Sequence, residues 1–157
     1  MKTTFAYIGK TQDKYLEEGT GIYERRLRHY LPYETVLIPD IKNGGKMDAG
    51  QLKIKEGEQI LARLKPEDCL ILLDERGKQY TSEQFAVTLD QWFQAPFKRL
   101  VFQVGGAYGF SEAVYQRANF QLGLSNMTFS HQMIRLFFLE QLYRAMTILR
   151  NEPYHNS

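Results

Sequence analysis

Three short segments of this sequence combine glycines or small polar residues in a way that suits ligand binding, and each directly follows an apolar run. They are DERGK at residues 74–78, GGAYG at residues 105–109 and LSNMTFSH at residues 124–131. Glycine lets a backbone approach a ligand closely, and the start of a helix leaves N–H groups free to bind one. If the apolar runs are parallel strands, their carboxyl ends meet at one edge of a sheet. The spacing predicts a small-molecule site built largely from backbone, although each segment alone is also consistent with a structural turn.

Charged and aromatic side chains that could act on a substrate gather towards the end of the chain. Glu140 and Arg144 lie four residues apart in an otherwise apolar segment, and Tyr154 and His155 follow in the tail. An arginine can stabilise negative charge that develops in a reaction, and a histidine can accept a proton near neutral pH. His131, in the third polar segment, is a second candidate proton acceptor. The alternatives left open are an ordinary ion pair, a capping histidine and a frayed tail.

Several common reaction types find no support in the sequence. GGAYG is not the G-x-G-x-x-G fingerprint of dinucleotide binding, and neither a P-loop nor a G-x-S-x-G nucleophile turn occurs. The three histidines, at positions 29, 131 and 155, and the single cysteine, Cys69, lack the spacing of metal ligands. We therefore expect no metal site, and a nucleotide-dependent oxidoreductase or a serine hydrolase of the elbow type is disfavoured.

The elements that would position these residues alternate between strand and helix. Strands are expected at residues 3–9, 35–38, 69–74, 100–104 and 120–124, and helices at residues 13–31, after Asp48, after Thr81, after Ser111 and from about 130 to 150. Asp48, Thr81 and Ser111 are the expected helix caps, and Gln84 completes a capping box with Thr81. This alternation predicts a single α/β domain over residues 1–157, with a mainly parallel sheet and helices on both faces.

Composition bounds the remaining possibilities. The 157 residues carry 20 basic and 18 acidic side chains, and 43% of them are apolar, as in an ordinary globular domain. The longest apolar runs are far shorter than the roughly 20 residues that span a membrane, and the first residues are too weakly apolar for a signal peptide. With one cysteine, these features predict a cytoplasmic protein. The net charge of +2 does not by itself indicate a nucleic-acid binder, although residues 25–29 form a basic cluster.

The segment expected to form the last helix, residues 130–150, is apolar nearly all round. Such a helix must be covered on several sides, and a chain this small offers few ways to cover them all. We therefore expect a second copy of the chain to complete the cover, which predicts a homodimer.

Four segments resemble the small SPOUT-class methyltransferases, which methylate N3 of a pseudouridine in 23S ribosomal RNA of the large subunit. They are LLDERGK (72–78), FQVGGAYG (102–109), LSNMTFSHQMIRLFFLEQLYRA (124–145) and PYH (153–155). The resemblance runs over essentially the whole chain. It implies a C-terminal trefoil knot, a homodimer, S-adenosyl-L-methionine as cofactor, and 23S rRNA in the assembled large subunit or ribosome as partner.

The resemblance also implies roles for individual residues. Arg144, oriented by Glu140, would stabilise charge on the carbonyl oxygens of the target base. His155, or second to it His131, would accept the N3 proton, with bulk water or hydroxide as the third alternative, and Tyr154 would stack on or bond the base. The cofactor contacts that it implies are Leu73, Gly105, Leu124, Ser125, Asn126, Met127, Thr128 and Phe129.

Two departures from the family pattern and three alternatives stay open. Ser130 stands where the family often has proline, and Asn156 and Ser157 stand where a basic residue is common, which weakens a phosphate contact. The alternatives are a knotted methyltransferase with a different RNA or protein target, a non-catalytic ribosome-binding factor with the same fold, and the oxidoreductase already disfavoured.

Overall fold

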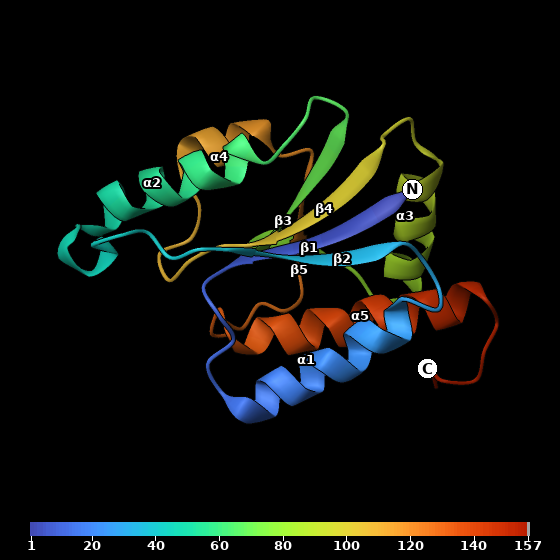
Figure 1. Cartoon of the computed structure of the whole chain (residues 1–157). Coiled ribbons are helices and arrows are strands. Elements are labelled where there is room, and N and C mark those ends of the chain that lie inside the picture. Colours follow the sequence, from blue (N-terminus) through green and yellow to red (C-terminus); the bar gives the residue numbers. More distant parts are fainter. Residues whose placement is uncertain (157) are drawn as a thin grey trace.

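The computed structural model describes residues 1–156, so Ser157 lies outside the described residues. A five-stranded parallel sheet in the order β2-β1-β4-β3-β5 forms its centre (Figure 1). The strands are β1 (Lys2–Ile8), β2 (Tyr33–Ile38), β3 (Asp68–Gln79), β4 (Arg99–Val104) and β5 (Phe120–Gly123). The predicted α/β sheet is confirmed, and all of its strand pairs are parallel.

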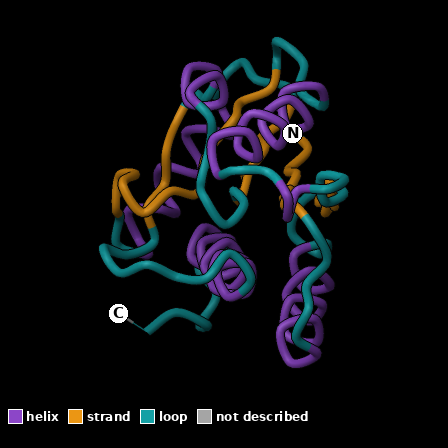
Figure 2. Tube along the Cα trace, turned by 90° about the vertical axis from the view of Figure 1, so that its left-hand side faces the viewer, coloured by secondary structure: helices purple, strands orange, loops and turns teal. Residues whose placement is uncertain are grey.

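Five α-helices cover both faces of this sheet, as predicted. They are α1 (Lys14–Leu27), α2 (Ala49–Ala62), α3 (Ser82–Gln94), α4 (Glu112–Arg117) and α5 (Met133–Leu149), with a short 3-10 turn at Gly44–Lys46. Helices α2 and α4 pack on one face, and α1, α3 and α5 on the other; Figure 2 shows helices above and below the strands. Within residues 1–156, none of the helices combines the length and the apolar character that a membrane span requires.

The predicted helix caps are confirmed, and they explain where three of the helices begin. Asp48 Oδ1 accepts the backbone N–H of Gln51 at 2.8 Å, and the Ser111 side chain caps α4. Thr81 and Gln84 form the reciprocal capping box at the start of α3. A cap satisfies N–H groups that the first helical turn leaves without partners, and each contributes about 1 kcal/mol.

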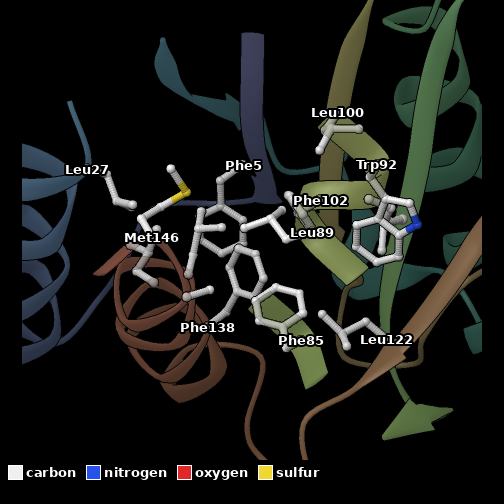
Figure 3. Close-up of a cluster of buried hydrophobic side chains, with 14 of the residues drawn as sticks. Phe5, Leu27, Phe85, Leu89, Trp92, Leu100, Phe102, Leu122, Phe138 and Met146 are labelled. Carbon is white, nitrogen blue, oxygen red and sulfur yellow. The ribbon is translucent and has the colours of Figure 1, made fainter. Parts of the chain in front are cut away.

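The core lies on both sides of β3 and β4, because successive side chains of a strand point to opposite faces. Cys69, Ile71 and Leu73 face α1, α3 and α5, while Leu70 and Leu72 face α2 and α4. Phe5, Phe102 and Phe138 join the larger cluster with their rings in contact (Figure 3). Burial raises the pKa of the Cys69 thiol to about 12, so this thiol is an apolar packing group.

Two predicted boundaries are wrong for physical reasons. The first helix ends at Leu27 rather than at residue 31, because the chain turns towards Pro32 and the start of β2. Strand β3 does not end at Asp74 but continues to Gln79, where Lys78 and Gln79 pair again with β5 after an irregular stretch. Gly77 permits this close pairing, since a Cβ there would lie 2.7 Å from backbone atoms of residues 121–123. The predicted loop after the third strand is thus partly strand.

Helix α5 is covered on more sides by its own chain than its sequence led us to expect. It packs on the sheet between α1 and α3, and its most exposed large apolar side chain is Phe137, which is 43% exposed. Its apolar character therefore gives less support to a second subunit than the sequence alone suggested. The helix also holds a fully buried cation, Arg135, that the sequence analysis did not single out.

Candidate functional site

The carboxyl ends of β3, β4 and β5 surround a cavity with a volume of about 840 Å³. The three polar segments predicted to meet at one edge of the sheet do meet there. All the predicted cofactor residues except Asn126 line this cavity, and so does His131. The lining residues that lie outside the three predicted segments and Leu73 are Lys53, Val104, Phe110, Glu112, Tyr115 and Ile134.

The loop after β4 lies against a buried carboxyl group. Gly109 N–H bonds to Gly106 C=O at 3.1 Å, which closes a tight turn, and a Cβ on Gly106 would lie 2.5 Å from both carboxylate oxygens of Glu56. Glu56 comes from α2, is buried, and its Oε1 has no hydrogen-bond partner among the described residues. Burial, with Asp40 nearby, raises the pKa of this carboxyl. A side chain at position 106 would therefore have to displace the Glu56 carboxylate, which lies against this loop.

A second carboxyl group borders the cavity where β3 begins its irregular stretch. Asp74 accepts hydrogen bonds from the Tyr115 hydroxyl and from the backbone N–H of Arg76. The Arg76 guanidinium donates to the same hydroxyl at 3.3 Å. This chain of hydrogen bonds ties the end of β3 to α4. The only signal for it in the sequence was the charge of residues 74–76.

The loop after β5 is held by short side-chain contacts. Ser125 Oγ accepts the Met127 N–H at 3.0 Å, and Thr128 donates to Glu75. Asn126 points away from the cavity and accepts from Gln79 Nε2 at 2.6 Å. Met127 is 77% exposed at the mouth of the cavity. This loop thus offers its backbone and one flexible apolar side chain to a ligand, while Asn126 braces it.

His131 lies where the loop after β5 leads into α5, and it lines the cavity. Burial lowers the pKa of its imidazole, and the nearby Arg135 acts in the same direction. Arg135 donates from Nε to the His131 carbonyl oxygen at 3.1 Å, and from its other nitrogens to the carbonyl oxygens of Ile8 and Gly9. The guanidinium also lies over the Tyr7 ring at 3.9 Å. Arg135 therefore fixes the start of α5 to the end of β1.

The other predicted catalytic residues form a separate cluster on α5 and the tail. Arg144 makes an ion pair with Glu140 at 2.5 Å and lies 4.8 Å from the centroid of the Tyr154 ring. Tyr154 donates its hydroxyl proton to Glu140 at 3.1 Å, and Arg144 Nη1 lies 3.0 Å from His155 Nδ1. Burial raises the pKa of the Tyr154 hydroxyl, so it stays protonated. The tail is therefore held in place by these contacts.

Two residues that the sequence analysis missed complete this cluster. Glu83, in the first turn of α3, lies 2.8 Å from His155 Nε2, and the hydroxyl groups of Tyr23 and Tyr154 are 3.3 Å apart. The capping box at Thr81 predicted that Glu83 would begin a helix, but nothing local to the sequence placed that helix next to the tail.

The cavity and the cluster lie on opposite sides of the loop after β5. Arg144, Tyr154 and His155 do not line the large cavity. A smaller cavity of about 360 Å³ lies beside the cluster, and Leu124 and Phe129 line both cavities, while Glu140 lines only the smaller one. Of the predicted catalytic residues, His131 is therefore the one that lines the large cavity together with most of the predicted cofactor contacts.

Comparisons with known proteins agree over nearly the whole chain. The family model described as "Predicted SPOUT methyltransferase" matches residues 1–155. The chain is 56% identical over 156 residues to ribosomal RNA large subunit methyltransferase H of Parabacteroides distasonis, and 50% identical to that of Porphyromonas gingivalis, with 99% of each chain covered. The crystal structure of a probable methyltransferase from Bordetella pertussis Tohama I has a similar fold. Its TM-score is 0.53 at 12% identity, and the match covers 92% of this chain and 94% of that one.

Proposed function

Because the chain belongs to the SPOUT methyltransferase family, whose members depend on S-adenosyl-L-methionine, we propose that it methylates N3 of a pseudouridine in 23S rRNA. The observation that carries this proposal is the 56% identity to a ribosomal RNA large subunit methyltransferase over 99% of both chains. The proposed substrate is the RNA of an assembled large subunit or ribosome, and the proposed place of action is the cytoplasm.

The large cavity suits S-adenosyl-L-methionine. Its volume of about 840 Å³ lies within the range of small-molecule sites. Leu73 and Phe129 provide apolar walls for an adenine ring, and the glycine turn at residues 105–106 lets the backbone approach the ligand. Asp74 and the neighbouring carboxylates suit the positive charges of the cofactor. The residues present therefore fit the cofactor that the family implies.

The reaction requires a deprotonated N3 and a straight path to the methyl group. S-adenosyl-L-methionine, held by the loops that line the large cavity, would supply an electrophilic methyl group on its sulfonium sulfur for the N3 electron pair. Negative charge spreads from N3 to the two neighbouring carbonyl oxygens as the proton leaves, and the planar fork of Arg144 can donate to such oxygens. Glu140, paired with Arg144, holds that fork in position. Tyr154, lying against Arg144, is positioned to stack on the base or bond to it.

Two imidazoles are candidates for the proton acceptor. His155 is the first candidate, because it lies next to Arg144, the residue proposed to donate to the carbonyl oxygens of the target base. His131 lines the cofactor cavity, and because burial lowers its pKa it is neutral and able to accept a proton at neutral pH. A comparison of His155→Gln with His131→Gln in single-turnover methyl transfer distinguishes the two, since loss of the acceptor lowers the rate of chemistry without changing cofactor affinity.

A homodimer would bring the large cavity of one copy next to the Arg144 cluster of the other. Arg144, Tyr154 and His155 do not line the large cavity of one chain, so a second copy could place its cluster, or its basic α1, next to the first copy's cavity. Phe137, with the Phe129 ring 4.9 Å away, provides exposed apolar surface for such contact. Sedimentation at equilibrium tests this part of the proposal, and a monomer at micromolar concentration contradicts it.

The proposed trefoil knot is supported by the path of the chain after β5. Residues 124–132 leave the edge of the sheet and reach β1, where Gln132 bonds to the Gln12 N–H at 2.9 Å and to the Lys10 carbonyl oxygen at 3.2 Å. On the way, Thr128 bonds to Glu75 beyond the buried part of β3. This segment therefore crosses the ends of strands that lie between β5 and β1 in the sheet.

Methyl transfer to defined ribosomal particles tests the proposed function. The protein is incubated with methyl-labelled cofactor and, in separate arms, 70S ribosomes, 50S subunits and free 23S rRNA that lack the modification. Mass spectrometry of nuclease fragments then locates the label. We expect N3-methylpseudouridine in the arms with assembled particles. Label in another RNA or in a protein changes the target, and binding to ribosomes without any transfer favours the non-catalytic factor.

A further inference from the structure

His155 is engaged at both ring nitrogens. Its Nδ1 lies 3.0 Å from Arg144 Nη1, and its Nε2 lies 2.8 Å from Glu83 Oε1. A guanidinium nitrogen can only donate a hydrogen bond and a carboxylate oxygen can only accept one. Nδ1 must therefore be the acceptor, and the proton of the neutral imidazole must lie on Nε2. The geometry is compatible with only one neutral tautomer.

We propose that Glu83 is a positioning residue for methyl transfer, which holds His155 with its proton on Nε2 and so leaves Nδ1 as the nitrogen that accepts the N3 proton. This inference rests on the proposed function, because it names the atom that removes the proton from the target base. It adds a residue from α3 to the cluster that α5 and the tail form.

The position of Glu83 is fixed by the start of α3. The capping box sets the first turn of that helix, and Ser82 Oγ donates to Gln141 Oε1 at 2.8 Å, which ties the same turn to α5. The hydrogen bond from His155 lowers the pKa of the Glu83 carboxyl, so it is ionised at neutral pH. Its side chain is 49% exposed, and a pair this exposed contributes little to the stability of the fold. A role in orienting the imidazole explains the contact better than a role in stability.

The proton transfer follows from these contacts. When the target base enters, the Arg144 donor that faces Nδ1 moves to a carbonyl oxygen of the base, which frees the Nδ1 lone pair. The N3–H bond then breaks, its electron pair stays on N3, and the proton forms a bond to Nδ1. The resulting imidazolium carries a proton on each nitrogen, and the Nε2 proton remains bonded to the Glu83 carboxylate. Glu83 thus stabilises the positive charge that His155 acquires.

Glu83→Gln separates this role from simple anchoring of the tail. The glutamine carbonyl oxygen can accept the same Nε2–H, but it carries no charge to stabilise the imidazolium. We expect kcat on ribosomes to fall about tenfold, with both KM values within about twofold of wild type and partial recovery in Glu83→Asp. Asp90→Asn, which removes a carboxylate from the same helix away from the cluster, is the matched control, and its kcat should equal that of the wild type. If Glu83 only anchors the tail, kcat of Glu83→Gln equals that of wild type, and this result overturns the proposal.

Nuclear magnetic resonance of the imidazole nitrogens provides a measurement that does not depend on activity. In ¹⁵N-labelled protein, the proton of neutral His155 should lie on Nε2 in both the wild type and Glu83→Gln. A proton on Nδ1 in the wild type overturns the proposal. If the wild type transfers no methyl group to any ribosomal particle, the proposed function fails, while a tautomer that becomes mixed in Glu83→Ala but not in wild type still shows that Glu83 orients His155.

Discussion

The cavity at the ends of β3, β4 and β5, where we propose that the cofactor binds, and the tail cluster are built in opposite ways. The cavity is formed by the loops at the carboxyl ends of three strands, where the glycine turn at residues 105–109 brings backbone to the surface beside apolar walls from Leu73 and Phe129. The tail cluster consists of charged and aromatic side chains from α1, α3, α5 and the tail, which bond to one another. The first suits recognition of a molecule with many polar edges, and the second suits a reaction in which charge appears and moves.

Because the two regions are built differently, we expect them to respond differently to substitution. Bulk added to the cavity should remove binding, because backbone contacts cannot be made around an obstructing side chain. Loss of one charge in the cluster should leave binding intact and slow the chemistry. The predictions below test this contrast, beginning with the largest expected effect.

Gly105→Trp should abolish binding of S-adenosyl-L-methionine. A Cβ at this position would already lie 3.2 Å from Phe110, and an indole would have to occupy the cavity. We expect isothermal titration calorimetry to show a loss of affinity of at least about hundredfold. Gly45→Trp is the matched control, because a Cβ there meets nothing within 4 Å. Retained binding by a folded Gly105→Trp variant would place the cofactor elsewhere.

Arg144→Lys should slow methyl transfer about hundredfold without changing cofactor affinity, because an ammonium cannot donate to the target base as a planar fork does. The measurement is single-turnover transfer to ribosomes together with calorimetry of cofactor binding. Arg150→Lys, near the end of the same helix, is the control and should keep the wild-type rate. An equal loss of binding and rate in Arg144→Lys would contradict the separation of the two regions.

Glu56→Gln should stabilise the protein by about 1 kcal/mol at pH 8, because a carboxylate with an oxygen that lacks a partner is replaced by a neutral amide. The pKa of Glu56 is raised in the folded state, so the wild type loses stability as pH rises from the ordinary carboxyl pKa through the raised value. The gain should therefore vanish near pH 4, where both side chains are neutral. Urea unfolding at both pH values measures this. Glu58→Gln, exposed on the same helix, should change stability by less than about 0.5 kcal/mol.

His131→Asn should flatten the dependence of stability on pH in mildly acidic solution, the smallest effect of the four. The folded-state pKa of His131 lies below the ordinary value of about 6.5, so the unfolded chain binds a proton more readily as pH falls through that value. The wild type therefore loses stability between about pH 7 and its lowered pKa, and the variant should lose less. Urea unfolding at half-unit pH steps measures the slope. An identical slope in both proteins would show that the pKa of His131 is the same in the folded chain as in the unfolded chain.

Local sequence signals predicted much of the fold and the cofactor cavity. The caps at Asp48 and Thr81 depend on residues three positions apart, and the meeting of the three loops follows from the geometry of a parallel sheet. The sequence did not predict Glu83, whose partner His155 is 72 residues away. Nor did it predict Glu56, since burial of that carboxylate depends on the glycine turn of another loop. Arg135 was visible as a cation in an apolar segment, but two of its carbonyl partners, Ile8 and Gly9, lie near the opposite end of the chain.

The bonds of Arg135 have a consequence for how the chain folds. They join α5 to the carbonyl oxygens of Ile8 and Gly9, across sequence separations of 127 and 126 residues. Contacts between such distant residues make folding slow, because nearly the whole chain must be ordered before they form. Residues 8 and 9 are synthesised long before residue 135, so these bonds must wait for the segment that forms α5. The wall that His131 and Ile134 form in the cavity at the ends of β3, β4 and β5 should therefore be completed only once α5 has docked against β1, and cofactor binding at the proposed site should wait for that step.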